Sequence, residues 1–487
     1  MRAQEPPVRT APVLVASNRG PLAFHRTDEG ALEGRRGGGG LVSGMTAATR
    51  SGTAVWVCAA LSDGDRAAAR GAPRGRLDEA GHDTGGAAVR MLDIEASTFH
   101  RAYNSIANSV LWFVNHQLYD TPNQPWFDER FRREWAAYGQ YNGAFAAALD
   151  EEAAEGATVV VQDYHLTLAP RLLRDRRPDL RIGHFMHTPW AMPDYFSLLP
   201  DAVVRDVLTG VLGADHAGFL SRRWADAFLL CCERLLGAEV DHERSTVRHE
   251  GRVIEVGVHA LGVDAGYLHD RGHQPDVETR LCALRDRVGD RKLVLRIDRT
   301  ELSKNIVRGL GAYRELLRAH PEWRGRVVHV AFAYPSRHDL PEYREYTGAV
   351  LRIAQEIEDE FATDGWEPVV LEVNDDFARS LAAYRLADVL VVNPIRDGMN
   401  LVAKEVPVLS ENGVALVLSR ECGAADDLGA AALLVNPYDV SQTAEAIHLA
   451  LLMDESERAA RTKRLAAGAT RLPPDRWFAE QLDALRR

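Results

Sequence analysis

Two cationic residues stand five positions apart after an apolar run in the second half of the chain. Arg299 directly follows KLVLRID (292–298), and Lys304 stands where the next helical pattern begins. Cations beside the first turn of a helix, where backbone N–H groups are unpaired, suit the binding of a diphosphate. A solvated charge pair at the start of a helix is the alternative interpretation.

A denser polar segment, RDGMNLVAKE (396–405), follows the apolar run VLVVNP (389–394). Asp397 and Asn400 are residue types that cap helices, and Gly398 allows a tight turn. The N–H groups of that helix start can face sugar hydroxyls or a phosphate. Glu405, about two turns later, can accept hydrogen bonds from a ribose diol. The alternative is a capped helix without a ligand, but so many polar groups on one strand–turn–helix unit favour a binding site.

The first half of the chain also carries polar residues at the ends of apolar runs. Asp163 follows TVVVQ (158–162), and His187 follows RIGHFM (181–186). A single Asp or His in such a place is more often a structural hydrogen-bonding group than a catalyst. Two of them at successive strand ends share one face of a sheet, which favours a cleft.

Four glycines, Gly37 to Gly40, precede a further helical pattern. Glycines before a helix let backbone N–H groups approach an anion, and a flexible loop is an equally good interpretation. They do not form the GxGxxG spacing of a dinucleotide-binding turn, which disfavours a dehydrogenase.

The elements that must position these residues are short apolar runs with helical patterns between them. Continuous runs such as VLVAS (13–17) and VALVLS (414–419) are typical of parallel strands buried on both faces. Residues 306–319 predict an amphipathic helix that ends before Pro321. Its buried face is expected to carry Ile306, Leu310, Tyr313 and Leu317. The pattern predicts an α/β fold with open parallel sheets.

Eleven such runs are too many for one small sheet, so we expect two domains, residues 1–264 and 265–474. The seam follows a hairpin pattern at 246–264 whose turn is Glu250-Gly251, and the polar residues 265–290 read as a linker. We expect residues 62–87 to be a mobile surface insertion. Two facing sheets would leave a cleft beyond the carboxyl ends of their strands.

Composition excludes several classes of protein. The net charge of the 487 residues is −12, which disfavours a binder of nucleic acid or anionic membranes. The five cysteines are scattered without a CxxC pair, which fits a reduced, cytoplasmic protein without a structural zinc site. The sequence has no apolar run of 18 residues and no apolar signal core at its start.

With these motifs in place, the sequence resembles the trehalose-6-phosphate synthase family of retaining glycosyltransferases. The resemblance runs from about Val13 to Asp439. It rests on SNRGP (17–21), GGL (39–41), Tyr103 with Trp112, DYH (163–165), HTP (187–189), Arg299 with Lys304, PSR (335–337), RDGMNLVAKE (396–405) and VNPYD (435–439).

The resemblance implies the GT-B fold, in which two Rossmann-like domains face an interdomain cleft. It implies that glucose passes from a nucleoside diphosphate glucose to glucose 6-phosphate, giving α,α-trehalose 6-phosphate. The N-terminal domain would bind the acceptor and the C-terminal domain the nucleotide sugar, with the last helix (about 475–487) crossing back onto the first domain. No metal or other cofactor is implied, and a homo-oligomer is left open.

By matched position, the resemblance also implies roles for single residues. It assigns the donor to Gly40, Arg299, Lys304, Asp397, Gly398, Met399, Asn400, Leu401, Val402 and Glu405. It assigns glucose 6-phosphate to Arg19, Tyr103, Trp112, Asp163 and Arg337, with Arg19 and Arg337 on the phosphate. The residues expected at the transfer itself are Asp163, His187, Arg299 and Lys304.

Three departures from the family pattern bear on the substrates. The second of two tryptophans near Trp56 is missing around Ala59, and the family's Lys-Gly is Lys304-Asn305. The base-recognition region contains Asp375 and Asp376; a carboxylate there can accept from guanine N1–H and N2–H together, which uracil does not offer. We therefore favour GDP-glucose over UDP-glucose as donor; the alternative is that both acids are solvated loop residues.

Two other functions are compatible with the same motifs. The departures also resemble validoxylamine A 7′-phosphate synthase, a relative that joins cyclitols and uses a GDP-linked donor. The intact run at 397–405 and Pro-Ser-Arg at 335–337 stand against that alternative. A non-catalytic sugar-phosphate sensor is the third hypothesis, and the joint retention of Arg299, Lys304, Asp397 and Glu405 argues against it.

Overall fold

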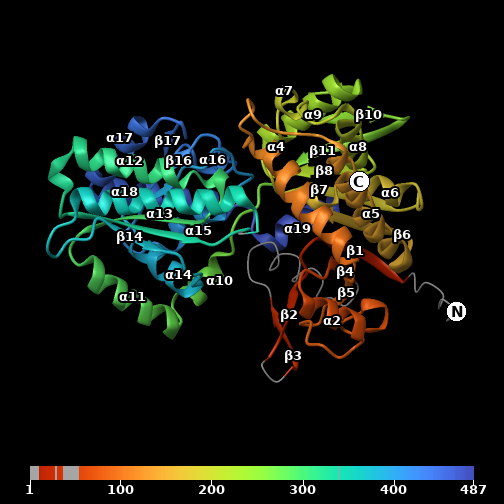
Figure 1. Cartoon of the computed structure of the whole chain (residues 1–487), viewed down its shortest axis with the longest axis horizontal. Coiled ribbons are helices and arrows are strands. Elements are labelled where there is room, and N and C mark those ends of the chain that lie inside the picture. The colour runs from red at the N-terminus through yellow and green to blue at the C-terminus, as the bar shows by residue number, and fades with distance from the viewer. Residues whose placement is uncertain (1–9, 28–29, 37–53, 338, 487) are drawn as a thin grey trace. The chain divides into compact units, whose positions relative to one another are not determined.

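A computed structural model describes residues 10–27, 30–36, 54–337 and 339–486. The chain forms two compact units. The first comprises Met1–Leu261 together with Pro474–Arg487, and the second comprises Gly262–Pro473. Many of the elements of both units are labelled in Figure 1.

The first unit is built on a nine-stranded sheet in the order β5-β4-β1-β6-β7-β8-β11-β10-β9. The strands from β5 to β11 are parallel, and β10 and β9 are antiparallel to their neighbours. The strands are β1 (Ala11–Ser17), β4 (Ala54–Ala59), β5 (Ala88–Leu92), β6 (Ala153–Gln162), β7 (Arg181–Met186), β8 (His216–Phe219), β9 (Glu239–Asp241), β10 (Thr246–His249) and β11 (Arg252–Val258). A separate antiparallel pair consists of β2 (Leu22–Arg26) and β3 (Leu32–Arg36).

Helices follow most strands of the first unit. The α-helices are α2 (Asp63–Gly71), α3 (Ala96–His100), α4 (Trp112–His116), α5 (Glu129–Glu152), α6 (Ala169–Arg174), α7 (Pro193–Phe196), α8 (Asp201–Val211), α9 (Arg222–Leu236) and α19 (Pro474–Arg486). Two short 3₁₀ turns are η1 (Pro73–Gly75) and η3 (Tyr164–Leu166), and η2 (Arg101–Leu111) is a π-helix.

The second unit has a six-stranded parallel sheet in the order β14-β13-β12-β15-β16-β17. The strands are β12 (Lys292–Arg299), β13 (Val327–Tyr334), β14 (Val369–Glu372), β15 (Val389–Val392), β16 (Ala415–Ser419) and β17 (Leu433–Val435). The helices are α10 (Ala265–Gly272), α11 (Pro275–Val288), η4 (Leu302–Lys304), α12 (Ile306–Ala319), η5 (Pro321–Trp323), α13 (Pro341–Phe361), α14 (Phe377–Leu386), α15 (Leu401–Leu409), α16 (Ala425–Leu428), α17 (Val440–Leu452) and α18 (Glu455–Ala469).

In both sheets the order in which strands are added reverses at the first strand. Strands are added on one side of β1 as far as β5 and then on the other side from β6, and the second unit repeats this pattern around β12. This strand order leaves a crevice beside the carboxyl end of the first strand, where open α/β sheets bind ligands. The crevice lies between the ends of β1 and β6 in one unit, and between the ends of β12 and β15 in the other.

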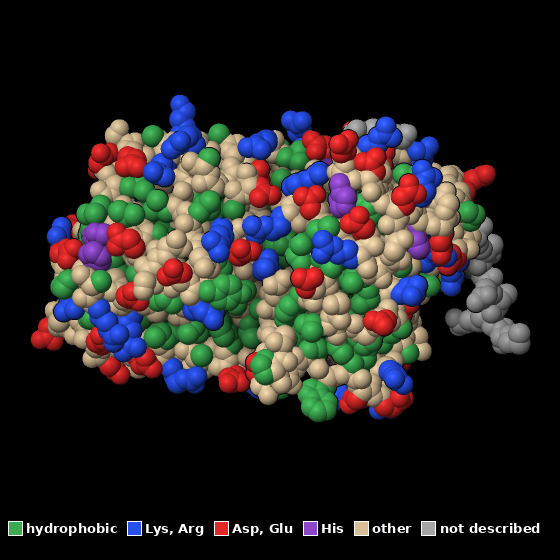
Figure 2. Space-filling view, turned by 90° about the horizontal axis from the view of Figure 1, so that it is seen from above, with side chains coloured by type: hydrophobic (Ala, Val, Ile, Leu, Met, Phe, Trp, Pro, Cys, Tyr) green, Lys and Arg blue, Asp and Glu red, His purple; other side chains and the backbone are tan. Residues whose placement is uncertain are grey.

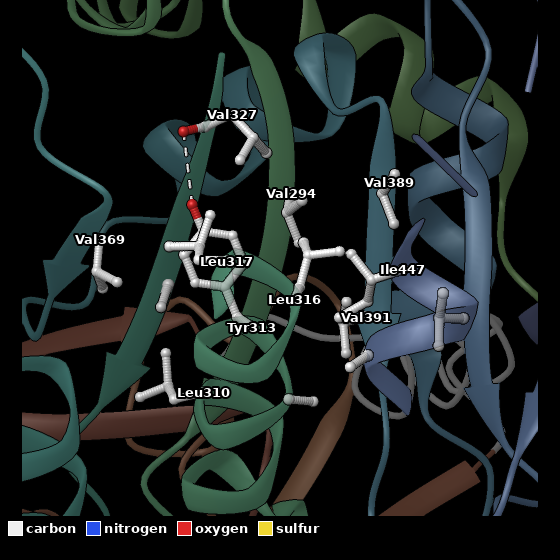
Figure 3. Packing of buried hydrophobic residues seen from close by; sticks show 14 of the residues in the cluster. Val294, Leu310, Tyr313, Leu316, Leu317, Val327, Val369, Val389, Val391 and Ile447 are labelled. Atoms are coloured by element: carbon white, nitrogen blue, oxygen red, sulfur yellow. Dashed lines mark hydrogen bonds between the residues drawn. The ribbon is translucent and has the colours of Figure 1, made fainter. Parts of the chain in front are cut away.

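The core of the second unit confirms the predicted helix over 306–319. The predicted buried face of α12 is fully buried, and Figure 3 shows Leu310, Tyr313 and Leu317 between the helix and the sheet. The Tyr313 hydroxyl donates to the backbone carbonyl of Pro368 at 3.0 Å, so its one polar atom is satisfied inside the core. This packing fixes the start of α12, and with it Lys304, against the end of β12.

The predicted hairpin and its turn are also confirmed. Strands β10 and β11 pair antiparallel, and Glu250 and Gly251 both have positive φ, as a two-residue turn of this kind requires. The prediction for residues 62–87 was wrong. Helix α2 is capped reciprocally by Ser62 and Asp65, and Asp65 also accepts from the backbone N–H of Phe24, so this segment is packed onto the unit.

On the face shown in Figure 2, the described Lys and Arg side chains are interspersed with Asp and Glu side chains. That face offers no continuous basic area to a polyanion, in keeping with the acidic net charge. Within the described part of the chain, none of the helices combines the length and apolar character needed to cross a bilayer.

Candidate functional site

The second unit has a pocket of about 240 Å³ at the carboxyl ends of β12 and β15. It therefore occupies the crevice that the strand order creates. Its lining comprises Ile297, Asp298, Arg299, Lys304, Tyr334, Asp375, Phe377, Ser380, Tyr384, Asn400, Leu401 and Val402. Six of the predicted donor residues are among them: Arg299, Lys304, Asp375, Asn400, Leu401 and Val402.

The two predicted cations differ in their surroundings. The Arg299 side chain is 53% exposed, and its guanidinium lies 3.6 Å from a Glu301 carboxylate oxygen. Lys304 is largely buried, and its Nζ lies 2.5 Å from Asp397 Oδ2. Burial alone would lower the pKa of Lys304, but the negative charges of Asp397 and Asp298 raise it above the ordinary value. The ammonium therefore stays charged at neutral pH, as anion binding requires.

The helix start after β15 is organised by Asn400. Its Oδ1 accepts from the N–H of Ala403, its Nδ2 donates to Asp397 Oδ2 at 3.0 Å, and its φ is 73°. Asparagine tolerates this left-handed conformation better than most residues. Asp397 therefore contacts both Lys304 and the first turn of α15, which joins the two motifs into one cluster. The N–H groups of Leu401 and Val402 belong to that first turn, where anions bind.

The turn between Asp397 and Asn400 is tightly packed. A Cβ on Gly423 would lie 1.9 Å from the carbonyl oxygen of Gly398, and the Cys422 thiol donates to the carbonyl of Met399. Met399 itself is buried. The backbone of Gly398 and Met399 is thus held in place by the segment after β16, which gives the pocket a rigid edge.

Glu405 is connected to the same pocket by a hydrogen bond from a tyrosine. It lies on α15, and the hydroxyl of Tyr384, which lines the pocket, donates to Glu405 Oε2 at 3.0 Å. Burial raises the pKa of the Glu405 carboxyl above its ordinary value. A half-buried carboxylate with remaining acceptor capacity suits a ligand that brings its own hydroxyl donors.

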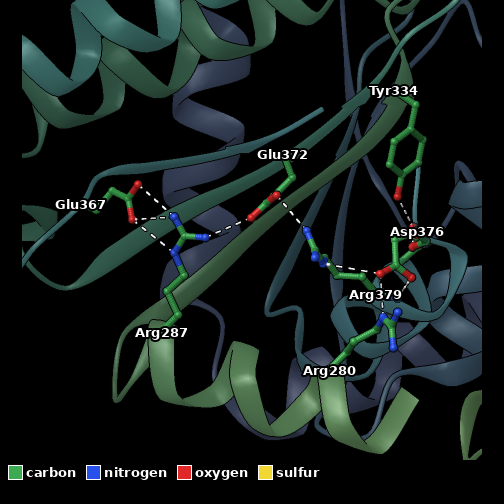
Figure 4. A network of polar contacts seen from close by, with 8 residues as sticks. Arg280, Arg287, Tyr334, Glu367, Glu372, Asp376 and Arg379 are labelled. Atoms are coloured by element: carbon green, nitrogen blue, oxygen red, sulfur yellow. Dashed lines mark hydrogen bonds and ion pairs between the residues drawn. The ribbon is translucent and has the colours of Figure 1, made fainter. Parts of the chain in front are cut away.

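The two acids of the predicted base-recognition loop have different environments. Asp375 is exposed and lines the pocket. Asp376 caps α14 by accepting from the N–H of Arg379, and its Oδ2 lies 2.6 Å from Arg280 Nε. Figure 4 shows Asp376 within a chain of ion pairs that continues through Glu372 to Arg287. Asp376 is therefore held by the protein, and Asp375 is the acid of the two that faces a ligand space.

Arg337 is bound to a buried acid. It follows β13 with φ of 45°, and its Nη1 lies 3.0 Å from Glu301 Oε1 and donates to the hydroxyl of Tyr343 at 2.7 Å. Glu301 is fully buried and also faces Arg299. One carboxylate thus lies between the arginine predicted for the donor and the arginine predicted for the acceptor phosphate. It holds Arg337 by a hydrogen bond and lies within ion-pair distance of Arg299.

The structure gives a conformational reason for Asn305, where the resembling family has glycine. Its φ is 60° and ψ is 36°, a left-handed conformation that glycine and asparagine tolerate. Its side-chain amide donates to the carbonyls of Asn393 and Pro437 at 2.9 and 2.7 Å. The substitution therefore keeps the turn after Lys304, and it gives no support to a different reaction.

In the first unit, Asp163 and His187 meet at the ends of β6 and β7. Asp163 Oδ1 accepts from the backbone N–H of His187 at 3.1 Å, and Asp163 has the unusual φ of 74°. His187 Nε2 lies 2.7 Å from Gln162 Oε1. Burial and the neighbouring His184 lower the pKa of His187 to about 3, so its imidazole is neutral. The pair can offer a carboxylate and a neutral imidazole to a sugar.

A π-helix explains how Tyr103 and Trp112 reach the same site. Tyr103 stacks on His165, and Trp112 lies against Tyr164, so both rings pack on the turn after β6. Trp112 is nine positions after Tyr103, which is 2.5 turns of an α-helix and would put the two on opposite faces. The π-helix Arg101–Leu111 contains Tyr103 and ends directly before Trp112. With roughly 4.4 residues per turn, nine residues make about two turns and return to one face.

Arg19 lies in the loop after β1, beside the end of β6, and is exposed. That loop is fixed by Ser17, whose hydroxyl accepts from Trp56 Nε1 at 2.8 Å and donates to the carbonyl of Arg19 at 2.7 Å. Gly20 follows in a place where a Cβ would lie 2.4 Å from Cys58 Sγ. The remaining predicted donor residue, Gly40, lies outside the described residues.

One group of potential metal ligands occurs among the described residues, away from both crevices. Ligand atoms of His320, Glu322 and His448 lie within 4.8 Å of one another. The two imidazoles stack face to face at 3.6 Å, so their in-plane lone pairs do not converge. The Trp323 indole N–H also donates to His448 Nδ1, which places the ring hydrogen on Nε2. This geometry favours a stacked pair over a metal site.

Sequence reasoning missed several residues of the site. Tyr334 stands at the very end of β13, Ser380 and Tyr384 lie inside α14, and Glu301 and Gln162 are buried. Tyr334 carried a signal, because it ends a strand beside β12 in the same way as Arg299. The positions inside α14 and the two buried positions carried no such signal, because nothing in their spacing distinguishes them from ordinary core residues.

Comparison with known proteins is consistent with this geometry. Residues 11–487 match the family model described as glycosyltransferase family 20. An alpha,alpha-trehalose-phosphate synthase [UDP-forming] 2 of Aspergillus fumigatus is 32% identical, over 93% of this chain and 92% of the relative. The UDP-forming synthase of Schizosaccharomyces pombe is 32% identical, over 93% and 86%.

Solved structures also match nearly the whole chain. An alpha,alpha-trehalose-phosphate synthase (UDP-forming) from Burkholderia vietnamiensis matches with a TM-score of 0.83 and 28% identity, over 98% of this chain and all of that one. The Escherichia coli structure described as bound with UDP-2-fluoro glucose matches with a TM-score of 0.85 and 25% identity, over 98% and 99% of the two chains.

Proposed function

Because the chain belongs to glycosyltransferase family 20, we propose that it transfers glucose from a nucleoside diphosphate glucose to glucose 6-phosphate, forming α,α-trehalose 6-phosphate. The observation that carries the proposal is the cluster of Arg299, Lys304 and the start of α15 in the crevice between β12 and β15. Two cations and a helix start at the switch point of a Rossmann-like sheet suit the diphosphate of a nucleotide sugar.

The reaction needs stabilisation of a leaving diphosphate more than it needs a protein nucleophile. As the bond between the anomeric carbon and the diphosphate oxygen breaks, negative charge grows on that oxygen, beside Arg299 and Lys304. The acceptor hydroxyl attacks from the same face, and its proton passes to the departing phosphate. Retention of configuration follows from this front-face attack, and charge stabilisation with positioning supplies most of the rate.

The remaining residues are given roles in each of the two units. In the second unit Glu405 binds the ribose, the segment from Asp397 to Val402 binds the donor sugar, and Arg337 binds the acceptor phosphate. In the first unit the acceptor is bound by Arg19, Tyr103 and Trp112, while Asp163 and His187 face the sugars.

The five free cysteines fit a cytoplasmic location.

A nucleotide-release assay tests this function. The chain is incubated with UDP-, GDP- or ADP-glucose, with and without glucose 6-phosphate, and both free nucleotide and disaccharide phosphate are measured. Release that depends on glucose 6-phosphate and yields trehalose 6-phosphate is the expected result. Absence of release with glucose acceptors would favour a cyclitol-joining enzyme, and binding of sugar phosphate without release would favour a sensor.

We further propose GDP-glucose as the preferred donor, with Asp375 as the residue that recognises guanine. The curated relatives named above are UDP-forming, so this preference sets the chain apart from them. A carboxylate that accepts from guanine N1–H and N2–H together is worth about 1–3 kcal/mol of base discrimination. We expect kcat/KM for GDP-glucose to exceed that for UDP-glucose about 10- to 100-fold, and Asp375→Asn to remove most of the difference.

Asp376→Asn is the matched control for Asp375→Asn. It weakens a helix cap and the ion pair with Arg280, so it should lower the free energy of unfolding by about 1 kcal/mol and leave the donor preference unchanged. Comparable turnover of both donors by the unmodified chain, or a preference for UDP-glucose, would contradict the assignment.

A further inference from the structure

The buried amide of Gln162 connects His187 to the last helix of the chain. Gln162 ends β6, and its Oε1 lies 2.7 Å from His187 Nε2. Its Nε2 lies 3.5 Å from Oε1 of Gln481 on α19, and Gln481 Nε2 lies 3.4 Å from the backbone carbonyl of Trp477. Both glutamines are buried. Three side chains therefore form a relay that ends on a main-chain carbonyl.

The direction of the relay is fixed by that carbonyl. A backbone carbonyl only accepts, so the group of Gln481 that faces Trp477 is its NH₂, and its oxygen faces Gln162. Gln162 then donates its own NH₂ to Gln481 and keeps its oxygen for His187. An amide oxygen also only accepts, so His187 Nε2 carries a hydrogen. Because burial keeps the imidazole neutral, Nδ1 is left with a lone pair.

The imidazole is also held by packing. The Phe185 ring lies 4.9 Å from it and the Trp477 ring 5.6 Å, and the backbone N–H of His187 donates to Asp163. Trp477 and Gln481 are four residues apart, so the same face of α19 supplies both the packing and the last amide of the relay. Rotating the ring would break the bond to Gln162.

We propose that Gln162 and Gln481 are positioning residues that hold His187 as its Nε2–H tautomer, so that Nδ1 accepts a hydrogen bond from a substrate hydroxyl. This inference rests on the proposed function, in which a sugar lies against His187. It assigns to the last helix a part in preparing the site, through an amide that contacts no reacting atom.

Few charged groups lie near the imidazole. The Asp163 carboxylate accepts from the backbone N–H of His187 and not from its ring, and His165 follows on the same turn as Asp163. On β7, His184 is neutral because burial lowers its pKa to about 4. On α19, Glu480 is directed to His259 at 3.7 Å. In the unmodified chain the His187 ring should therefore not titrate near neutral pH.

Gln162→Glu tests the proposal through the pH dependence of the reaction. A carboxylate against Nε2–H favours the imidazolium, in which Nδ1 is a donor and no longer accepts. We expect kcat/KM of Gln162→Glu to fall about tenfold relative to the unmodified chain near pH 6 and to recover toward pH 9, as the ring loses its proton. Gln162→Leu should lower kcat/KM without the added pH dependence. Gln140→Glu, which adds the same charge at an exposed position of α5, should leave the profile unchanged.

A second measurement needs no substrate. Long-range ¹H–¹⁵N correlation spectra of histidine-labelled protein at neutral pH should show Nε2 protonated and Nδ1 unprotonated for His187, assigned by comparison with His187→Asn. Gln481→Met should shift that signal toward a mixture of tautomers. A protonated Nδ1 in the unmodified chain, or a Gln162→Glu profile parallel to that of a folded Gln140→Glu, would overturn the proposal. If the chain transfers no glucose at all, the proposed function fails, and the spectrum still decides the tautomer.

Discussion

Replacing Arg299 by alanine should lower kcat/KM for the nucleotide-sugar donor about 10²- to 10³-fold and leave the fold intact. Its guanidinium lines the pocket at the end of β12, where the proposed reaction would develop charge on the leaving diphosphate. More than half of the Arg299 side chain is exposed, and the Glu301 carboxylate lies 3.6 Å from its guanidinium, so removing Arg299 uncovers no tightly paired buried charge. Steady-state kinetics with the donor varied, together with thermal unfolding, measure the two effects.

Lys292→Ala provides the matched control, because Lys292 begins the same strand that Arg299 ends. Lys292 is ion-paired with Asp388 and lies outside the pocket, so kcat/KM should not change. Lys304→Ala should match Arg299→Ala in rate, but it should also destabilise the chain, because Asp397 loses its closest cation. Unchanged kcat/KM in both pocket variants would remove the diphosphate assignment, as would a bound nucleotide that contacts neither residue.

The sequence was most informative where chemistry coincides with the end of a strand. Arg299, Asp163 and His187 were found because each follows a continuous apolar run, and such runs become central parallel strands. Because the first strand of each sheet lies inside it with neighbours on both sides, the ends of neighbouring strands share one crevice. The positions of these residues could therefore be predicted without any knowledge of tertiary contacts.

The parts that could not be predicted depend on contacts between distant segments. The ion pair of Glu301 with Arg337 joins residues 36 apart, and the sequence presents Glu301 as one more acid in a polar turn. The π-helix at 101–111 departs from the period that a helical pattern assumes, so its effect on Tyr103 is invisible in the spacing. The sequence alone does not distinguish Asp376 from Asp375. The structure does, because Arg280, 96 residues away, donates to Asp376.

The second large effect concerns the acceptor phosphate. Arg337→Ala should raise the KM for glucose 6-phosphate about 100-fold, since a charge-assisted contact to the phosphate is lost. It should change kcat/KM for unphosphorylated glucose little, so the preference for the phosphorylated acceptor should collapse. Measuring both acceptors at saturating donor separates loss of phosphate binding from general damage. Arg344→Ala, an exposed arginine seven residues later, should affect neither acceptor.

Arg337→Ala alone carries a stability cost that must be separated from its effect on binding. Glu301 is fully buried and would lose its closest cation, which is expected to cost about 3 kcal/mol of the free energy of unfolding. In the double variant Arg337→Ala/Glu301→Gln the buried group is neutral, so most of that stability should return. The KM for glucose 6-phosphate should stay high, because the amide does not replace the guanidinium. If the double variant recovered its affinity for glucose 6-phosphate together with its stability, Arg337 would be a structural partner of Glu301 and not a phosphate ligand.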